Sequence, residues 1–238
     1  MFIGQGYGIV ALALITLVVN MFRRVAVFIL ARNLLLELRV SRNNLDRTLF
    51  KPLFDYSKYT FIAKIGDILR FQIDALVIAQ ILGLSMVTHY NIAIRLLDYI
   101  SQGMGAVLGI FQPVFTRDFS IGGAESLVPK FLFATRIAIL FGGCAEGAAI
   151  IFGHPFIAIW MGEAYLDAYV PLAILGAVGI LGVIQWPGLN VLYASANHKI
   201  YAWVNIIEGI TNLTLSLVLI KFFGIIGVAI GTAIPFFI

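Results

Sequence analysis

AYVPLAILGAVGILGVIQWPGLNVLYA, the stretch at residues 168–194, contains no acidic or basic side chain. A helix of about 20 apolar residues crosses the hydrocarbon core of a bilayer, and this stretch exceeds that length. Apolar stretches of similar length recur along the chain between short polar segments. We predict membrane-spanning helices near residues 4–22 (extending toward 31), 54–82, 86–114, 130–152, 168–194 and 201–221.

The overall composition excludes a soluble globular protein. Hydrophobic residues make up 61% of the 238 residues, charged residues make up 12%, and the mean hydropathy is +0.99. A soluble domain carries about 45–50% apolar and about 25% charged residues. We therefore predict an all-α fold, a polytopic transmembrane helix bundle whose first partner is the lipid bilayer.

The sequence carries no motif for catalysis or cofactor binding. No nucleotide-binding loop, metal-ligand cluster or nucleophile constellation appears in it. The single cysteine, Cys144, excludes an internal disulfide and a cysteine-based metal site. We therefore predict no enzymatic activity, no cofactor, no metal centre and no nucleic-acid partner.

The last apolar stretch, residues 224–238, is too short to cross a bilayer. We predict that it is part of a seventh helix and that the protein continues beyond residue 238. The first apolar stretch starts almost directly at Met1, which predicts a continuation at that end as well.

The charges in the loops predict an orientation. An excess of Lys and Arg marks the cytoplasmic side of a membrane protein. Basic residues dominate residues 23–51 and are present at 115–130 and 195–200. The alternate loops differ, because 83–87 has no charge and 153–170 has acidic residues but no Lys or Arg. We therefore predict that the three basic loops face the cytoplasm.

Three of the predicted helices carry polar side chains along one face. In residues 54–82 the ionisable residues are spaced three or four apart, which places them on one side of a helix. Such residues are unfavourable in a membrane and normally face a protein interior or a cavity. We therefore predict a polar or hydrated interior between the three helices. The stripes consist of Lys64, Asp67, Arg70 and Asp74; of Thr88, Asn91, Arg95, Asp98, Gln102, Gly105, Gly109 and Gln112; and of Asn205, Glu208, Asn212 and Ser216.

One interpretation is that charges on the first two stripes form ion pairs. The first two of these helices are joined by a turn of a few residues, so they should lie antiparallel and adjacent. Matching depths across that turn places Arg70 level with Asp98, and Asp74 level with Arg95. Because buried charges are usually paired, these four residues would then hold the two helices together.

A second interpretation is that the charges line a solvated cavity. Lys64, Asp67 and Glu208 are the better candidates for this role, and neither Lys64 nor Glu208 has an evident partner at its depth. Glu146 lies deep within the 130–152 stretch and is a further candidate for a functional residue.

Short motifs follow one another along the chain in a recognisable order. The most specific, IWMGEAY at residues 159–165, is similar to the L-W-L-G-E-x-Y outer loop of oligosaccharide flippases. QIDALVI at 72–78 and YNIAIR at 90–95 are similar to that family's D-x-L-I-I-G-x-x-L-G and Y-x-x-A-x-R motifs. Further matches are residues 38–57, PVFTR at 113–117, YASAN at 193–197 and GIIGVA at 224–229. The chain thus resembles the polysaccharide-biosynthesis branch of the multidrug/oligosaccharidyl-lipid/polysaccharide exporter superfamily.

This resemblance implies a MATE-like transporter fold built from two repeated halves. Residues 1–36 would then be the last helix of the first half, and residues 37–53 would be a cytoplasmic linker. Residues 54–238 would form most of the second half.

The resemblance also implies a function, the translocation of a lipid-linked oligosaccharide for surface polysaccharide biosynthesis by alternating access. The substrate would be of the undecaprenyl-pyrophosphate type, a cation would couple transport to an ion gradient, and the location would be the bacterial inner (plasma) membrane. Matching to the family motifs selects Asp74 and Arg95 as cavity residues. The complete predicted set is Lys64, Asp67, Arg70, Asp74, Asn91, Arg95, Asp98, Gln102, Glu208 and Asn212.

Two other functions remain open. A cation-coupled, multidrug-type exporter of the same superfamily would favour acidic cavity residues such as Asp67 and Glu208. A membrane-embedded glycan polymerase or ligase would require a large outer loop with paired catalytic groups. The longest predicted outer loop, residues 153–170, is small and has only Glu163 and Asp167 as acidic residues.

Overall fold

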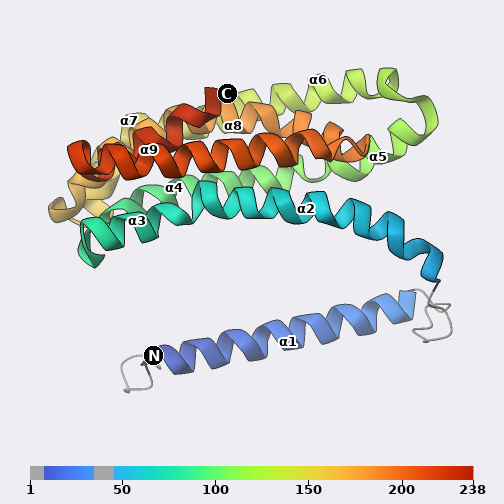
Figure 1. Cartoon of the computed structure of the whole chain (residues 1–238), viewed down its shortest axis with the longest axis horizontal. Helices are drawn as coiled ribbons and strands as arrows, with labels where there is room; N and C mark the ends of the chain where they lie inside the picture. The colour runs from blue at the N-terminus through green and yellow to red at the C-terminus, as the bar shows by residue number, and fades with distance from the viewer. Residues whose placement is uncertain (1–7, 35–45, 238) are drawn as a thin grey trace. The chain divides into compact units, whose positions relative to one another are not determined.

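The described part of the chain is helical throughout its regular structure. The computed structural model describes residues 8–34 and 46–237, and every regular element in these ranges is a helix (Figure 1). The predicted all-α fold is therefore confirmed. Most of the predicted linker at 37–53 lies outside the described residues, so its role stays a prediction.

The chain divides into two compact units, the first formed by residues Met1–Lys51. Its described part contains the long apolar helix α1 (Gly8–Leu34) and a short 3-10 helix, η3 (Arg47–Leu49). Asp46 caps η3 because its carboxylate accepts a hydrogen bond of 2.8 Å from the backbone N–H of Thr48.

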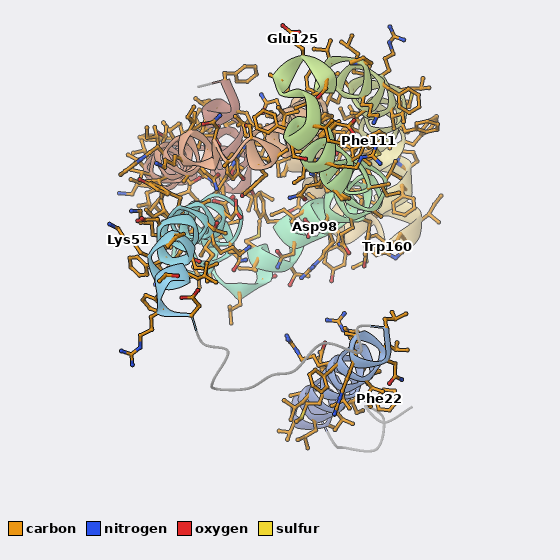
Figure 2. All side chains as sticks on the ribbon, turned by 90° about the vertical axis from the view of Figure 1, so that its right-hand side faces the viewer. Phe22, Lys51, Asp98, Phe111, Glu125 and Trp160 are labelled. Atoms are coloured by element: carbon orange, nitrogen blue, oxygen red, sulfur yellow. The ribbon has the colours of Figure 1, made fainter. Side chains whose placement is uncertain are left out.

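The second unit, Pro52–Ile238, is a bundle of long helical rods. A single non-helical residue, Gln72, separates the first two elements, and a π-helix joins two others. Figure 2 looks at this bundle from one end. The elements are α2 (Phe50–Phe71), α3 (Ile73–Ile81), α4 (Leu84–Leu108), α5 (Phe111–Gly122), η4 (Ala124–Leu127), α6 (Val128–Ile137), the π-helix η5 (Ala138–Gly143), α7 (Cys144–Trp160), η6 (Glu163–Ala168), α8 (Tyr169–Ala194), α9 (His198–Ala233) and η7 (Ile234–Phe237).

Four stretches of the described chain are long and apolar enough to cross a membrane, by length and composition. The helices α2 and α4 carry the predicted polar stripes, which lower their hydropathy. The described residues of the predicted stretches lie mainly in helices, and their assignment as membrane spans stays a prediction. The four apolar stretches are Ala13–Leu34, Ala124–Trp160, Glu163–Ala194 and Lys199–Phe237.

The helix α9 is two helical segments that fold back on each other at Gly224. This residue has φ 58° and ψ −137°, a left-handed backbone that glycine adopts without the strain of a side chain. A Cβ on Gly231 would lie 2.6 Å from Ser216 Oγ, whereas fifteen residues of a straight helix would separate them by about 22 Å. The chain therefore reverses sharply at Gly224, between the predicted stretches 201–221 and 224–238.

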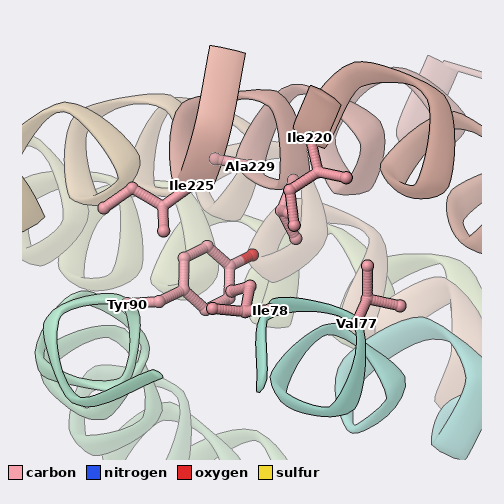
Figure 3. Packing of buried hydrophobic residues seen from close by; sticks show 7 residues of the cluster. Val77, Ile78, Tyr90, Ile220, Ile225 and Ala229 are labelled. Carbon is pink, nitrogen blue, oxygen red and sulfur yellow. The ribbon is translucent and has the colours of Figure 1, made fainter. Parts of the chain in front are cut away.

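This reversal returns the last segment to the core of the second unit. Figure 3 shows Val77 and Ile78 of α3 beside Tyr90 of α4, with Ile225 and Ala229 of the returning segment above them. Tyr90, Ile78 and Ala229 are completely buried. The packing brings polar groups near the carboxyl-terminal end of α9 against α3 and α4.

Candidate functional site

The polar stripes of α2 and α9 face each other and form a largely buried network of polar contacts. At one end, the Asn205 side-chain amide donates to the Ala63 carbonyl at 2.8 Å and to the Asp67 carboxylate at 2.7 Å. The Tyr201 hydroxyl donates to the same Asp67 oxygen at 3.3 Å. Gly66 permits this contact, because a Cβ there would lie 2.8 Å from the backbone carbon of Asn205.

The centre of this α2–α9 network is an ion pair between Arg70 and Glu208. Both residues are buried, and the guanidinium of Arg70 also lies 3.9 Å from the ring centroid of Phe236. The Asn212 side-chain amide donates to the Arg70 carbonyl at 2.7 Å. The predicted pairing of Arg70 with Asp98 is therefore wrong, and so is the expectation that Glu208 lacks a partner.

The other end of the network is Asp74 of α3, which is only 1% exposed. Its Oδ2 accepts hydrogen bonds from the Tyr90 hydroxyl at 3.0 Å and the Thr232 hydroxyl at 2.7 Å. Its Oδ1 is buried without a hydrogen-bond partner among the described residues. The predicted pairing of Asp74 with Arg95 is therefore wrong.

Other neutral oxygens gather close to Asp74. The Ser216 hydroxyl donates to Asn212 Oδ1 at 2.8 Å, and the Thr232 hydroxyl lies 3.5 Å from the same oxygen and 3.0 Å from the Val228 carbonyl. Thr232 was not among the predicted site residues. It carries the one hydroxyl in the apolar stretch 224–238, and that was a signal available in the sequence.

The α4 stripe does not join this network. Arg95 and Asp98 have side chains that are 67% and 45% exposed, and their closest approach, 3.6 Å, is to each other within the helix. Gln102 is exposed and Asn91 is half-buried. Figure 2 shows Asp98 at the margin of the bundle. The prediction of one polar interior shared by three helices is therefore wrong, because two stripes meet inside and the third faces outward.

Lys64 also stays outside the buried network. Its side chain is 65% exposed, and its ammonium group lies 3.7 Å from the Asp67 carboxylate one turn along α2. The predicted site residues thus form two groups. Asp67, Arg70, Asp74, Glu208 and Asn212 belong to the α2–α9 network, in which Asp67 is half-buried and the other four are buried. Lys64, Asn91, Arg95, Asp98 and Gln102 lie outside this network and are half-buried or exposed.

A bundle of long apolar helices with polar groups paired inside it defines a polytopic membrane protein. The chain belongs to the polysaccharide biosynthesis protein family, whose model matches residues 2–170. The predicted family is therefore confirmed.

Three relatives are similar to this chain, two of them named as membrane proteins and one as a flippase. The uncharacterized membrane protein MJ1068 of Methanocaldococcus jannaschii is 27% identical over 81% of this chain and 38% of its own length. The uncharacterized membrane protein EpsK of Bacillus subtilis is 28% identical over 77% of this chain and 37% of its own. The probable low-salt glycan biosynthesis flippase Agl15 of Haloferax volcanii is 26% identical over 78% of this chain and 39% of its own.

The chain spans less than two fifths of the length of these relatives, between 37% and 39%. No solved structure matches it.

Proposed function

We propose that the complete protein moves a lipid-linked oligosaccharide from the cytoplasmic to the outer leaflet of the plasma membrane by alternating access. The outward α4 stripe carries this proposal. Charged side chains are unfavourable against lipid and face a protein interior or a water-filled path. Arg95 and Asp98 are exposed on a bundle of membrane-spanning composition, so the stripe lines a hydrated path in the complete transporter.

The chemistry of the α4 stripe suits a glycan joined to a phosphate. Asn91, Asp98 and Gln102 supply donors and acceptors for sugar hydroxyls. The guanidinium of Arg95 suits phosphate oxygens, which it can bind with two parallel hydrogen bonds. A pyrophosphate-linked polyprenyl oligosaccharide of the undecaprenyl type combines both groups, and one relative carries the name of a glycan biosynthesis flippase.

The alternative, an exporter of small amphipathic cations, has less support. It would require free carboxylates such as those of Asp67 and Glu208. Asp67 accepts hydrogen bonds from Asn205 and Tyr201, and Glu208 pairs with Arg70. Asp98 remains as an accessible carboxylate, but Arg95 lies beside it.

Gene deletion and complementation test the proposed translocation. We expect deletion to abolish a surface glycan and to trap its lipid-linked repeat unit on the cytoplasmic leaflet. Arg95→Gln should fail to restore export, whereas Arg136→Gln, the same change on an exposed arginine of α6, should restore it. A normal surface glycan together with new drug sensitivity would support the exporter instead.

We further propose that the coupling cation binds beside Asp74. Hard cations prefer oxygen ligands, and the unpartnered Asp74 Oδ1 lies in a buried cluster of neutral oxygens. Asp74, Asn212 and Thr232 would hold the ion, with the Val228 carbonyl nearby. One carboxylate among neutral ligands balances a single positive charge, which favours a monovalent ion such as Na⁺.

Sodium dependence of export and of thermal stability tests this cation site. We expect Na⁺ to stabilise the full-length protein relative to choline, and Asp74→Asn to remove the difference. Asp98→Asn, the same change on the outward stripe, should keep it. Equal stability of the wild type in both salts would refute sodium binding without bearing on the cargo.

A further inference from the structure

Glu146 is a buried carboxyl group that belongs to neither the α2–α9 network nor the α4 stripe. It is 1% exposed and lies near the start of α7, directly after the π-helix η5 (Ala138–Gly143). From Glu146 to the end of α7 at Trp160, the helix runs for about 20 Å. The hydrocarbon core of a bilayer is about 30 Å thick, so the carboxyl group lies deep in the membrane.

The surroundings of Glu146 are tight and apolar. A Cβ on Gly179 of α8 would lie 3.0 Å from the Glu146 carboxyl carbon, and one on Gly176 would lie 3.6 Å from Oε2. Leu97 of α4 and Ile150 of α7 also lie close to Gly176. Glycines of α8 thus leave a space that the carboxyl group fills.

No partner reaches this carboxyl group within the described ranges. Its Oε2 is buried without a hydrogen bond, and no ion pair to Glu146 is present there. The titratable groups of the elements packed around it interact elsewhere or lie apart. On α4, Arg95 pairs with Asp98, His89 pairs with Asp167, the Tyr90 hydroxyl donates to Asp74, and Tyr99 is exposed. On α7, Cys144 is exposed and the His154 ring packs against Tyr169, whose hydroxyl donates to the Ile150 carbonyl. The titratable residues of α8 are tyrosines, and η5 has none.

These surroundings decide which ligand the carboxyl group can take. A metal cation requires several oxygen ligands, and this pocket offers one carboxyl group in a space closed by α8. An ionised carboxylate without partners is strongly unfavourable in an apolar interior, and such a group takes up a proton instead. The ligand that fits is therefore a proton.

The π-helix beside Glu146 is the second observation. Such segments are rare and occur often at functional sites, because they disrupt the regular i→i−4 hydrogen bonds of the helix. We propose that Glu146 is a proton-binding site of the membrane bundle. It is protonated while α7 and α8 are in contact, and loss of the proton separates them and admits water. The site does not depend on the identity of the cargo.

Infrared difference spectroscopy on the full-length protein in lipid nanodiscs tests the protonation. We expect a carboxylic-acid C=O band at neutral pH in the wild type that E146Q lacks. E125Q, the same change on an exposed glutamate, should keep the band. An unchanged spectrum in E146Q would show an ionised carboxylate at rest and overturn the proposal.

Hydrogen exchange tests the coupled separation of α7 and α8. Raising the pH should reduce the protection of backbone amides in residues 172–183 of the wild type, after correction for the intrinsic rate. In E146Q, which stays neutral, protection should not change with pH. An identical pH response in both proteins would overturn the separation. Neither measurement involves a glycan, so both stand apart from a failure of the proposed translocation.

Discussion

The buried ion pair of Arg70 and Glu208 should behave very differently from the exposed pair of Arg95 and Asp98. The side chains of the buried pair are 10% and 12% exposed, against 67% and 45% for the exposed pair. Removal of one partner from a buried pair leaves an uncompensated charge and destabilises by about 3–5 kcal/mol. We therefore expect Glu208→Leu to destabilise the protein by about 3–5 kcal/mol.

A double-mutant cycle separates the interaction energy of the ion pair from the packing energy that each single substitution removes. Arg70→Met combined with Glu208→Leu removes both charges, so the double variant should be more stable than the sum of the single effects predicts. The coupling should reach about 1–3 kcal/mol. Exposed ion pairs within one helix contribute about 0.3–0.5 kcal/mol. The coupling energy from the cycle of Arg95→Met and Asp98→Leu should therefore be no larger than this.

The assay is thermal or denaturant unfolding of the full-length protein in one detergent, with the transition monitored by two probes. A parallel cycle of Arg70→Met with Asp98→Leu serves as the control, because the structure places these residues in different groups. A coupling of Arg70 to Asp98 as strong as that to Glu208 would refute the assigned pairing. So would a coupling between Arg70 and Glu208 below about 0.5 kcal/mol, the value of an exposed pair.

Two further predictions concern packing and pH. Gly66→Val should destabilise the protein by about 1–3 kcal/mol, because the valine side chain would overlap Asn205. Gly103→Val is the control for size, because a Cβ added there meets nothing within 4 Å. Equal unfolding midpoints of the two variants would contradict the close contact at Gly66. The hydrogen bond from Lys130 holds the pKa of the Asp118 carboxyl below its usual value. The resulting stabilisation is present above the unfolded pKa of about 3.9 and is lost as the pH falls through the folded value. Asp118→Asn should therefore lower the unfolding midpoint at neutral pH and not in strong acid, and an equal effect at both would argue against the interaction.

Helical periodicity identified the polar faces of α2 and α9 because it depends only on local geometry. The spacing of Asp67, Arg70 and Asp74 fixes which side of the helix they share. The spacing does not determine which other helix packs against this side. Depth matching across the α3–α4 turn gave Arg70 and Asp98 equal heights, but it could not give their rotation, and the true partner of Arg70 comes from α9.

The contribution of the returning segment was harder to anticipate. Thr232 reaches Asp74 only because Gly224 reverses the chain, and the sequence did not indicate the direction of the segment that follows. The orientation of the bundle and the division into transporter halves remain predictions. They depend on which side of a membrane each loop faces and on residues of the linker that the structure does not describe.

Hydrogen-bond and ion-pair partners separate the structural carboxyl groups of this bundle from the functional candidates. Asp67 and Glu208 lie at the α2–α9 contact and both have partners, so they stabilise that contact. The buried carboxylate oxygens that differ are Asp74 Oδ1 and Glu146 Oε2, each without a hydrogen bond among the described residues. The amide oxygen of Asn205 also lacks one there, but it is neutral.

A buried carboxylate oxygen without a hydrogen bond is unfavourable unless a bound ligand supplies the missing interaction. The two candidates differ in their neighbours, and these neighbours decide the ligand. Asp74 lies among hydroxyl, amide and carbonyl oxygens that suit a cation, whereas Glu146 lies among glycine and aliphatic groups that suit a proton. Two ionic ligands bound in separate helix contacts would let one bundle respond to two gradients, and variants at one site should leave binding at the other unchanged.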